Sequence, residues 1–363
     1  MGNILKYINK VKDLINISKY AGERFDLTQV GGGNSSIKFD SGEMIIKASG
    51  FLLSEINKNH GYSKVLTNKI TNIVRNEKII NSKDKRERES ITKNLVEIST
   101  LDKNNRPSIE TLLHSLLLKY TLHTHPIVVN MIVIREEWRT ILKEIFKDES
   151  ILLIEYQTPG IELALVLDKE LSKLNTTPNI IFLQNHGLII TSNNKEDIKK
   201  LTEYVLEKIE KYLKVDMKKY KLTNKITELL NRIDITSNIS YLSEDTFLNE
   251  QLKNNEELFF SKPFCPDSLV YCGISAVKIH DLLDTQSLLS YKEQFHTLPK
   301  VIIFENKLFF IAENIKKSKE IEEMFKSHIM VLTKNKYSQK NFLTIKELSY
   351  LSNWEAETYR QNI

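Results

Sequence analysis

TLHTHPIVVNMIV, residues 121–133, is the stretch from which the site and the fold are most directly predicted. Its β-branched residues favour a strand over the whole stretch, and that strand carries His123 and His125. Side chains two positions apart in a strand point to the same face. The two imidazoles are therefore able to bind one metal ion. The alternative is a packed or solvated histidine pair, which is common on strands.

A third histidine changes the balance between these alternatives. His186 lies in the turn Asn185-His186-Gly187, between apolar runs at 180–183 and 188–191 that we predict to be strands. A turn at a strand end presents its side chain into a cleft. Three neutral imidazoles with an open position are typical of a catalytic zinc site rather than a closed structural one. Spacing alone leaves open whether the three converge.

Glycine is scarce, at 11 residues, and five of the glycines lie between residues 31 and 50. The sequence GGGNSS at 31–36 leads into a predicted strand at 36–39, and KASG at 47–50 follows a second predicted strand at 43–47. The first loop lacks the Lys-Ser/Thr ending of a P-loop and the spacing of a dinucleotide fingerprint. Its backbone N–H groups, amide and hydroxyls indicate either a phosphate nest or a tight entry turn.

Another candidate group begins a helix. Pro107 and Glu110 have the pattern of a helix start, with proline and an acid in the first turn. Glu110 is either a fourth ligand or general base, or an acid that stabilises the helix dipole. His114, one turn further on, is interpreted as a helix-face residue rather than a ligand.

The remaining pattern divides the chain. A helix opens it, a polar Lys/Arg-rich segment at 62–105 is predicted to be a solvated helical insertion, and a long amphipathic helix starts near residue 194. We predict a catalytic domain at 1–220, a linker at 221–257 and a small α/β domain at 258–363. The last contains predicted strands and helices at 268–271, 301–304, 308–312, 318–332 and 345–361.

Composition excludes several classes of protein. The chain has 363 residues, of which 41% are hydrophobic, and a net charge of only +5. This is an ordinary globular range, with no basic stripe for nucleic acid and no apolar run long enough for a membrane span. The two cysteines, Cys265 and Cys272, fit no disulfide framework or zinc pattern. We expect a cytoplasmic protein with reduced thiols and no signal peptide.

The order of the motifs resembles the class II aldolase/adducin family, and most closely its rhamnulose-1-phosphate aldolase-like branch, including the aldolase part of bifunctional aldolase/dehydrogenase proteins. The motifs are GGGNSSIKF, IIKASGFLL, RPSIETLLH, HTHP, EYQTPGIELA and QNHGLII. Two C-terminal segments, KPFCPDSLVYCG and LSNWEAETYRQ, show a less specific resemblance to the same branch. The resemblance implies an α/β fold in α-β-α layers, with a central, mostly antiparallel sheet covered by helices.

The resemblance also implies roles for individual residues. His123, His125 and His186 would hold a divalent metal, usually Zn²⁺, with Mn²⁺ or Co²⁺ as alternatives, and Glu110 would be the general acid/base. Tyr156 matches, more loosely, a family tyrosine that donates a proton from a neighbouring subunit. The substrate or its phosphate would lie against the following residues: Gly33, Asn34, Ser35, Lys47, Ser49, Gly50 and Ser108. Ile109 stands where related aldolases have a second serine.

The implied reaction is cleavage of a ketose, expected to be a 1-phosphate, to dihydroxyacetone phosphate and an aldehyde. Its enediolate would be stabilised by the metal acting as a Lewis acid. The same fold also supports epimerases, dehydratases and decarboxylases of sugar phosphates, and non-catalytic adducin-like interaction modules. We expect a homo-oligomer, with a tetramer suggested by the family. The region around Cys265 and the pair Trp354-Glu355 would shape the pocket or pack within the C-terminal domain.

Overall fold

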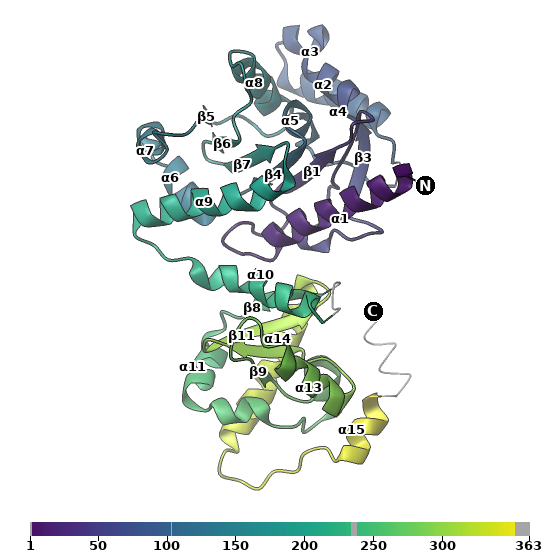
Figure 1. Cartoon of the computed structure of the whole chain (residues 1–363), viewed down its shortest axis with the longest axis vertical. Coiled ribbons are helices and arrows are strands. Elements are labelled where there is room, and N and C mark those ends of the chain that lie inside the picture. The colour runs from purple at the N-terminus through teal and green to yellow at the C-terminus, as the bar shows by residue number, and fades with distance from the viewer. Residues whose placement is uncertain (1, 103, 234–237, 353–363) are drawn as a thin grey trace. The chain divides into compact units, whose positions relative to one another are not determined.

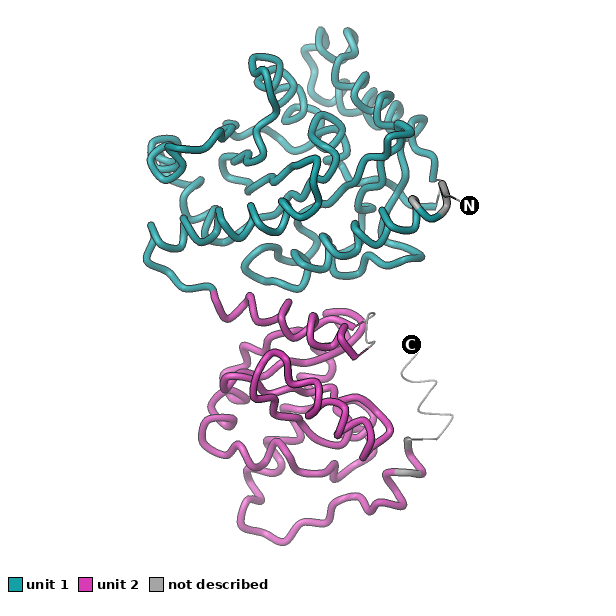
Figure 2. Tube along the Cα trace, viewed as in Figure 1, with its two compact units in different colours: residues 1–217 teal, residues 218–363 magenta. Residues whose placement is uncertain are grey.

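The computed structural model describes residues 2–102, 104–233 and 238–352 of the chain. It divides into two compact units, Met1–Met217 and Lys218–Ile363 (Figure 2). None of the described helices is long and apolar enough to cross a membrane. Each unit has its own sheet and its own hydrophobic core, and each is described separately below.

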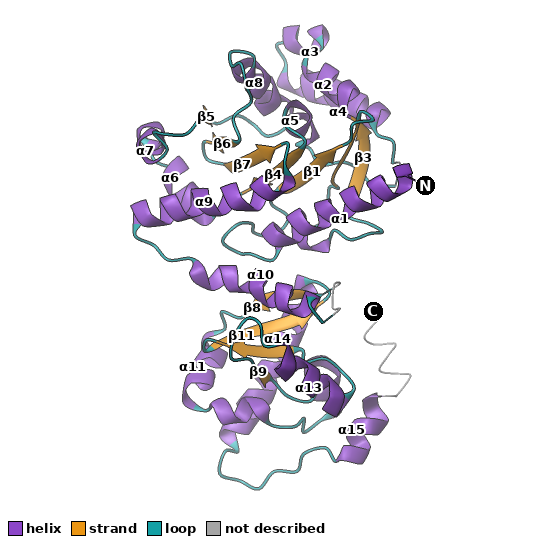
Figure 3. Ribbon diagram, in the orientation of Figure 1, coloured by secondary structure: helices purple, strands orange, loops and turns teal. Residues whose placement is uncertain are grey.

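Unit 1 is built on a seven-stranded sheet in the order β3-β2-β1-β4-β7-β6-β5 (Figure 3). All neighbouring strands are antiparallel except β5 and β6, which are parallel. The prediction of a mostly antiparallel sheet is therefore confirmed. The strands are β1 Asn34–Lys38, β2 Glu43–Lys47, β3 Tyr62–Leu66, β4 Tyr120–Thr124, β5 Ile151–Ile154, β6 Ile180–Leu183 and β7 Gly187–Ser192.

Helices cover both faces of this sheet (Figure 1). Alternate strand residues contribute to two separate apolar clusters, because successive side chains in a strand point to opposite faces. One cluster includes residues of α1 Gly2–Gly22, α6 Ile127–Val133, α7 Trp138–Ile145 and α9 Lys195–Leu213. The other includes residues of α2 Thr67–Val74, α3 Glu77–Asn81, α4 Lys85–Ser99, α5 Thr111–Leu116 and α8 Ile161–Leu171. The predicted α-β-α layering is thus confirmed.

The strand predicted over 121–133 is wrong in its second half. β4 ends at Thr124, and Pro126 is the N-cap of α6. Proline fixes its own φ and has no N–H to donate to a strand ladder, so the strand ends there. Val129, Ile132 and Val133 are then buried at helical spacing. Tertiary packing has overridden the β-branched composition.

The polar segment 62–105 is not purely helical, as we expected, because it begins with the edge strand β3. Residues 62–66 alternate between half-buried and buried positions as they pair with β2. The alternation is short and includes only two large apolar residues, Val65 and Leu66, so the period-two signal was weak. The α2–α4 helices follow, and α4 exposes most of its charged residues while burying Thr92 and Ser99.

Unit 2 has a four-stranded sheet in the order β8-β11-β10-β9, antiparallel except for the parallel pair β9 and β10. Its strands are β8 Ile239–Leu242, β9 Val277–Lys278, β10 Val301–Phe304 and β11 Lys307–Ala312. Its helices are α10 Lys218–Asn231, α11 Thr246–Asn254, α12 Pro266–Cys272, α13 Thr285–Phe295, α14 Ile315–Lys334 and α15 Ile345–Ser352. Two short 3-10 turns, η1 Leu53–Glu55 in unit 1 and η2 Glu256–Phe260 here, complete the secondary structure of the described chain.

Two expectations for this region differ from the structure. Residues 268–271, predicted as a strand, form part of α12. Pro266 and Asp267 lie in the first turn of this helix, where proline and an acidic residue are favoured. The segment 221–257, expected to be a linker, contains most of α10 together with β8 and α11. Leu222, Ile226, Leu229 and Leu230 of α10 are buried, so this segment contributes to the core of unit 2. Trp354, Glu355 and the end of the helix predicted at 345–361 lie outside the described residues.

Candidate active site

The central strand β4 places the first two candidate ligands. His123 lies within β4 and is fully buried, and His125 follows the strand's last residue. The backbone N–H of His125 donates to Leu27 O at 2.9 Å, which holds this strand end against the segment before the glycine loop. The two Nε2 atoms are 3.1 Å apart. The prediction that the pair faces one point is therefore confirmed.

His186 joins them from the turn between β6 and β7. Asn185 has a positive φ of 53°, which asparagine tolerates better than most residues, and the His186 N–H donates to Leu183 O. The His186 Nε2 lies 3.3 Å from that of His123. Gly187 is required here, because a Cβ at this position would stand 2.3 Å from Thr124 O and 3.1 Å from the His125 ring.

The three imidazoles fit a divalent metal ion. Their ligand atoms all lie within 4.8 Å of one another, which makes them a candidate metal-binding group. The His123 Nδ1 is 3.0 Å from Leu188 O, and this backbone contact leaves its Nε2 directed at the other two rings. Burial lowers the pKa of His123 to about 3 and that of His186 to about 4, and it also lowers the pKa of His125. Neutral imidazole is the form that binds metal.

Glu110 completes the cluster. It occupies the N-cap position of α5, and its carboxylate oxygens lie 3.3 Å from His186 Nε2 and 3.6 Å from His123 Nε2. Its side chain is 5% exposed, and Oε1 has no hydrogen bond to any described residue. The Asn34 amide donates to Oε2. This buried carboxylate lies beside three imidazoles, and one of its oxygens has no hydrogen-bond donor. It could therefore bind a metal directly or form hydrogen bonds with the residues that bind it.

Several of the predicted substrate-binding residues surround Glu110. Asn34, Lys47 and Ser108 are all buried. Ser108 N–H donates to Lys47 O at 3.2 Å, and Ser108 Oγ accepts a hydrogen bond from the Glu110 N–H at 3.3 Å. Burial lowers the pKa of Lys47, while the negative charges of Glu110 and Glu55 oppose that shift. One cation, one amide and one hydroxyl thus lie around the carboxylate.

Ser49 and Gly50 lie beside this group in an exposed loop. Ser49 N–H donates to Arg106 O at 2.8 Å, which places the 48–50 loop next to the segment that precedes Ser108. Gly50 has a φ of +89°, so its backbone conformation favours glycine. The exposed Ser49 therefore lies beside the segment that precedes Ser108, while its own N–H is already bonded to Arg106 O.

Ser35 does not belong to this group, and its prediction as a substrate ligand is corrected. Its hydroxyl contacts Ser18 Oγ of α1 at 2.6 Å and is fully buried. In β1, Asn34 and Ser36 point to the face of α5, so Ser35 between them points to the face of α1. All three residues of the run Asn34-Ser35-Ser36 are small and polar, so the sequence does not indicate which of them face the core on each side of the sheet.

The glycine loop has a role that sequence reasoning missed. A Cβ at Gly32 would stand 2.7 Å from His125 Nδ1, and one at Gly33, whose φ is +79°, would stand 2.9 Å from His123 O. The loop therefore packs directly against two of the three histidines. The three consecutive glycines were the available signal, and both predicted roles, a phosphate nest and a tight entry turn, left out this packing against the histidines.

Tyr156 and His114 have other positions. Tyr156 follows β5, is 54% exposed, and through its backbone N–H bonds to Gln184 Oε1. No hydrogen bond or ring contact in the described chain joins it to Glu110 or to the three histidines. His114 is fully buried rather than on an exposed helix face, with Nδ1 2.7 Å from Ser36 Oγ, and burial lowers its pKa. It contacts β1 through Ser36 and is not one of the three histidines that form the candidate metal-binding group.

The fold and the site together define a three-layer α/β protein with three imidazoles and one carboxylate converging at the centre of a mostly antiparallel sheet. This chain belongs to the family of the class II aldolase and adducin N-terminal domain, which matches residues 12–213. The match covers nearly all of unit 1 and ends before unit 2 begins.

Relatives of the chain are distant. It is 25% identical over 212 residues to the uncharacterized oxidoreductase YuxG of Bacillus subtilis (strain 168), a match that covers 56% of this chain and 29% of that protein. The chain therefore spans less than a third of that relative's length. The described structure is similar to the N-terminal class II aldolase domain of a conserved protein from Thermoplasma acidophilum, with a TM-score of 0.47, 20% identity, and coverage of 56% of this chain and 93% of that one. It is similar to an L-fuculose 1-phosphate aldolase with a TM-score of 0.41, 18% identity, and coverage of 56% and 85%.

Proposed function

We propose that this protein is a divalent-metal-dependent aldolase that cleaves a ketose phosphate to dihydroxyacetone phosphate and an aldehyde. The observation that carries the proposal is the convergence of His123, His125 and His186 on one point, with Glu110 within 3.3–3.6 Å of two of them. Three histidines and a nearby carboxylate on a rigid central sheet leave coordination positions for a substrate.

Each residue would have a distinct part in the reaction. The three histidines would hold Zn²⁺, or Mn²⁺ or Co²⁺ in its place, and such an ion supplies a Lewis acid for a carbonyl and hydroxyl oxygen when bound. Glu110 would transfer the proton at the carbon next to that carbonyl. Asn34 fixes the Glu110 carboxylate through its amide, and the buried Lys47 balances its charge.

The phosphate group would lie against Asn34, Ser49, Gly50 and Ser108, where backbone and side-chain donors are grouped. Gly33 would contribute its backbone to this region, where it packs against His123 O. Ile109, where related aldolases have a second serine, is 59% exposed and offers no hydrogen bond from its side chain. We therefore propose a phosphorylated substrate whose phosphate is held by one hydroxyl fewer at this point.

Tyr156 would act on the aldehyde side of the substrate of a neighbouring subunit. Its side chain is more than half exposed at the end of β5, which suits contact with a second copy of the chain. We propose a homo-oligomer, a tetramer as in related aldolases, so that each site is completed by a neighbour.

The motif order of unit 1, together with KPFCPDSLVYCG at 262–273, supports placing the chain in the rhamnulose-1-phosphate aldolase-like branch, among proteins of which some are bifunctional. The greater length of the Bacillus subtilis relative is in keeping with such a branch. Both cysteines are free thiols, which supports a cytoplasmic location.

Metal content tests the proposal first. We expect about one zinc, manganese or cobalt ion per chain by elemental analysis. We expect its loss in His123→Ala and His186→Ala, but not in His280→Ala, which removes an exposed histidine of unit 2. Full metal content in folded His123→Ala and His186→Ala proteins would refute the site. A wild type that binds no metal even after reloading would favour the adducin-like interaction module instead.

Product analysis then tests the reaction. Metal-loaded protein is incubated with a panel of ketose 1-phosphates, and release of dihydroxyacetone phosphate is followed with a coupled enzyme. Glu110→Gln keeps the size of the side chain but removes its ability to carry the proton, so we expect loss of about 10²-fold or more in rate with metal still bound. Conversion of the substrate without release of a three-carbon product would replace aldol cleavage by the epimerase, dehydratase or decarboxylase alternative.

A further inference from the structure

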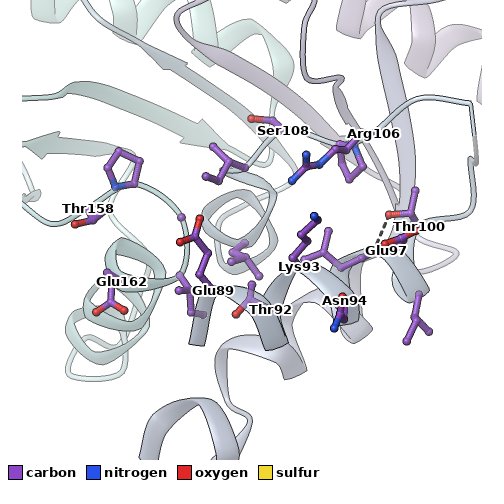
Figure 4. Close-up of a pocket in the computed structure, with 18 of the residues that line it drawn as sticks. Glu89, Thr92, Lys93, Asn94, Glu97, Thr100, Arg106, Ser108, Thr158 and Glu162 are labelled. Carbon is purple, nitrogen blue, oxygen red and sulfur yellow. Dashed lines mark hydrogen bonds between the residues drawn. The ribbon is translucent and has the colours of Figure 1, made fainter. Parts of the chain in front are cut away.

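A cavity of about 1340 Å³ opens in unit 1 between α4, residues 105–109 and the turn at 158–160 that leads into α8 (Figure 4). Its volume exceeds the roughly 300–1,000 Å³ that small-molecule sites typically have. The three histidines and Glu110 are not among its lining residues, and Ser108 is the residue that it shares with the group around Glu110.

Two cations extend into one part of this cavity. Figure 4 shows the side chains of Lys93, from α4, and Arg106, from the segment before Ser108, directed into the same part of the hollow. Neither side chain has a hydrogen bond or ion pair to the residues that the structure describes. Like charges directed at one region repel each other unless an anion lies between them. This part of the cavity therefore has the electrostatics of an anion site.

None of the carboxylates that line the cavity forms an ion pair with Lys93 or Arg106 in the described part of the chain. Glu162 is ion-paired with Arg88 at 2.8 Å, and Asp102 accepts hydrogen bonds from Asn104 N and from the Asn105 amide. Figure 4 shows Glu89 on the side of Thr158 and Glu162, and Glu97 beside Thr100. These acids restrict an anion to the part of the cavity that Lys93 and Arg106 share with Ser108.

One hydroxyl adds a neutral donor. Ser108 Oγ accepts a hydrogen bond from the Glu110 N–H, so its own proton remains available to an acceptor in the cavity.

The opposite part of the cavity is apolar. Ile109 is 59% exposed and faces this space beside Gly160, whose Cβ position is 3.3 Å from Ile109 Cγ1. An exposed isoleucine gains from being covered by an apolar ligand surface. The apolar residues that line the cavity are Val96, Ile98, Pro107, Ile109, Leu112, Pro159 and Ile161.

We propose that this cavity binds a phosphate ester with a large organic substituent. Its phosphoryl group lies between Lys93 and Arg106, with Ser108 as a hydroxyl donor, and its organic part covers Ile109 and the apolar wall. None of the candidate metal ligands lines the cavity, and binding there does not require the aldolase reaction, although the Ser108 hydroxyl is also one of the groups proposed above to contact the substrate's phosphate. Its ligand is either the far end of the substrate or an effector, because Ser108 connects the cavity to Glu110.

Calorimetric titration of the full chain tests this site with three probes: uridine 5′-monophosphate, inorganic phosphate and uridine. We expect the nucleotide to bind, inorganic phosphate to bind more weakly, and uridine not to bind. Arg106→Gln and Lys93→Gln should each weaken nucleotide binding by about tenfold or more, since each removes a charge-assisted contact. Lys143→Gln, which removes an exposed lysine of α7 outside the cavity, is the matched control and should change nothing.

Circular dichroism of the Arg106→Gln and Lys93→Gln proteins should match that of the wild type, which would show that weakened nucleotide binding is not caused by misfolding. No binding of the nucleotide at millimolar concentration, or equal binding by the Arg106→Gln and wild-type proteins, would overturn the proposal. Equal affinity for nucleotide and inorganic phosphate would overturn the role of the apolar wall.

A metal-site variant separates this inference from the proposed function. Nucleotide binding should persist in His123→Ala, and its loss there would show that the phosphoryl group binds at the metal centre rather than in the cavity. Failure of the aldolase assay leaves the calorimetric result standing. If cleavage is observed, competitive inhibition by the nucleotide identifies the cavity as the site of the substrate's far end, and non-competitive inhibition identifies an effector site; both support the cavity as a binding site.

Discussion

Replacing Gly32 by alanine should weaken metal binding without unfolding the protein. Gly32 has an ordinary backbone conformation, so alanine introduces no strain in φ, but its Cβ would stand 2.7 Å from His125 Nδ1 and 3.1 Å from His125 Cε1. Ordinary contacts with a Cβ begin near 3.4 Å. The half-buried imidazole ring therefore has to move by about 0.7 Å, and the Gln29 carbonyl oxygen, 3.0 Å from the same Cβ position, has to give by a few tenths of an ångström.

A metal site does not tolerate such a shift, because ligand distances hold to within about 0.2 Å. Displacement of an oriented ligand typically costs about 10- to 100-fold in metal affinity, or about 1.4–2.7 kcal/mol. The assay is competition for zinc between the protein and a chelating dye, at pH 7.5. Thermal unfolding of the metal-free proteins shows whether the fold has been preserved.

Gly31→Ala is the matched control, since a Cβ at Gly31 would have no atom within 4 Å. The two variants change neighbouring glycines in the same loop and so lose similar chain flexibility. Gly31→Ala should bind zinc with wild-type affinity. Zinc affinity of Gly32→Ala within about twofold of that of Gly31→Ala would refute the claim that the glycine loop positions His125.

Two further predictions concern stability. Asn34→Ala removes the amide that donates to the buried Glu110 carboxylate and should lower the free energy of unfolding by about 1–3 kcal/mol in urea, whereas no loss would mean that water replaces the amide. Burial lowers the pKa of His328 in unit 2 to about 4, so above pH 6.5 the imidazole is neutral in both the folded and the unfolded chain. As the pH falls from about 6.5 towards 4, only the unfolded chain takes up this proton, and stability should fall by up to about 3 kcal/mol. In His328→Gln, the free energy of unfolding measured in urea should depend less steeply on pH. An unchanged pH dependence would count against the role of His328.

The candidate histidines could be found from short-range patterns, although their convergence could not. His123 and His125 are two residues apart at the end of one strand, and His186 lies in a turn between Asn185 and Gly187. Strand register then brings the strand and the turn together, since β4 pairs with β7 directly after that turn. The three histidines could be identified from the sequence, whereas their convergence depends on the pairing of β4 with β7.

Other features depended on information that is not local. Residues 126–133 have strand composition, but Pro126 and burial on one face make them a helix. Ser35 points to the face opposite Asn34 because of a one-residue choice of register, which the sequence leaves open. The cavity beside α4 is formed by segments that are more than 50 residues apart in the chain, among them Lys93 and Thr158, and no spacing rule relates them.

The order of the strands has a consequence for when the metal site can form. β1, β4 and β7 are neighbours at the middle of the sheet, yet Asn34 is 76 residues from Glu110 in sequence, and His123 is 63 residues from His186. An unfolded chain offers a metal only the adjacent pair His123 and His125, which is a weak ligand set. Unlike the ion of a zinc finger, which organises a short local loop, the ion here can bind tightly only after distant segments have paired. Metal uptake should therefore follow the assembly of the sheet, and added zinc should slow unfolding far more than it speeds folding.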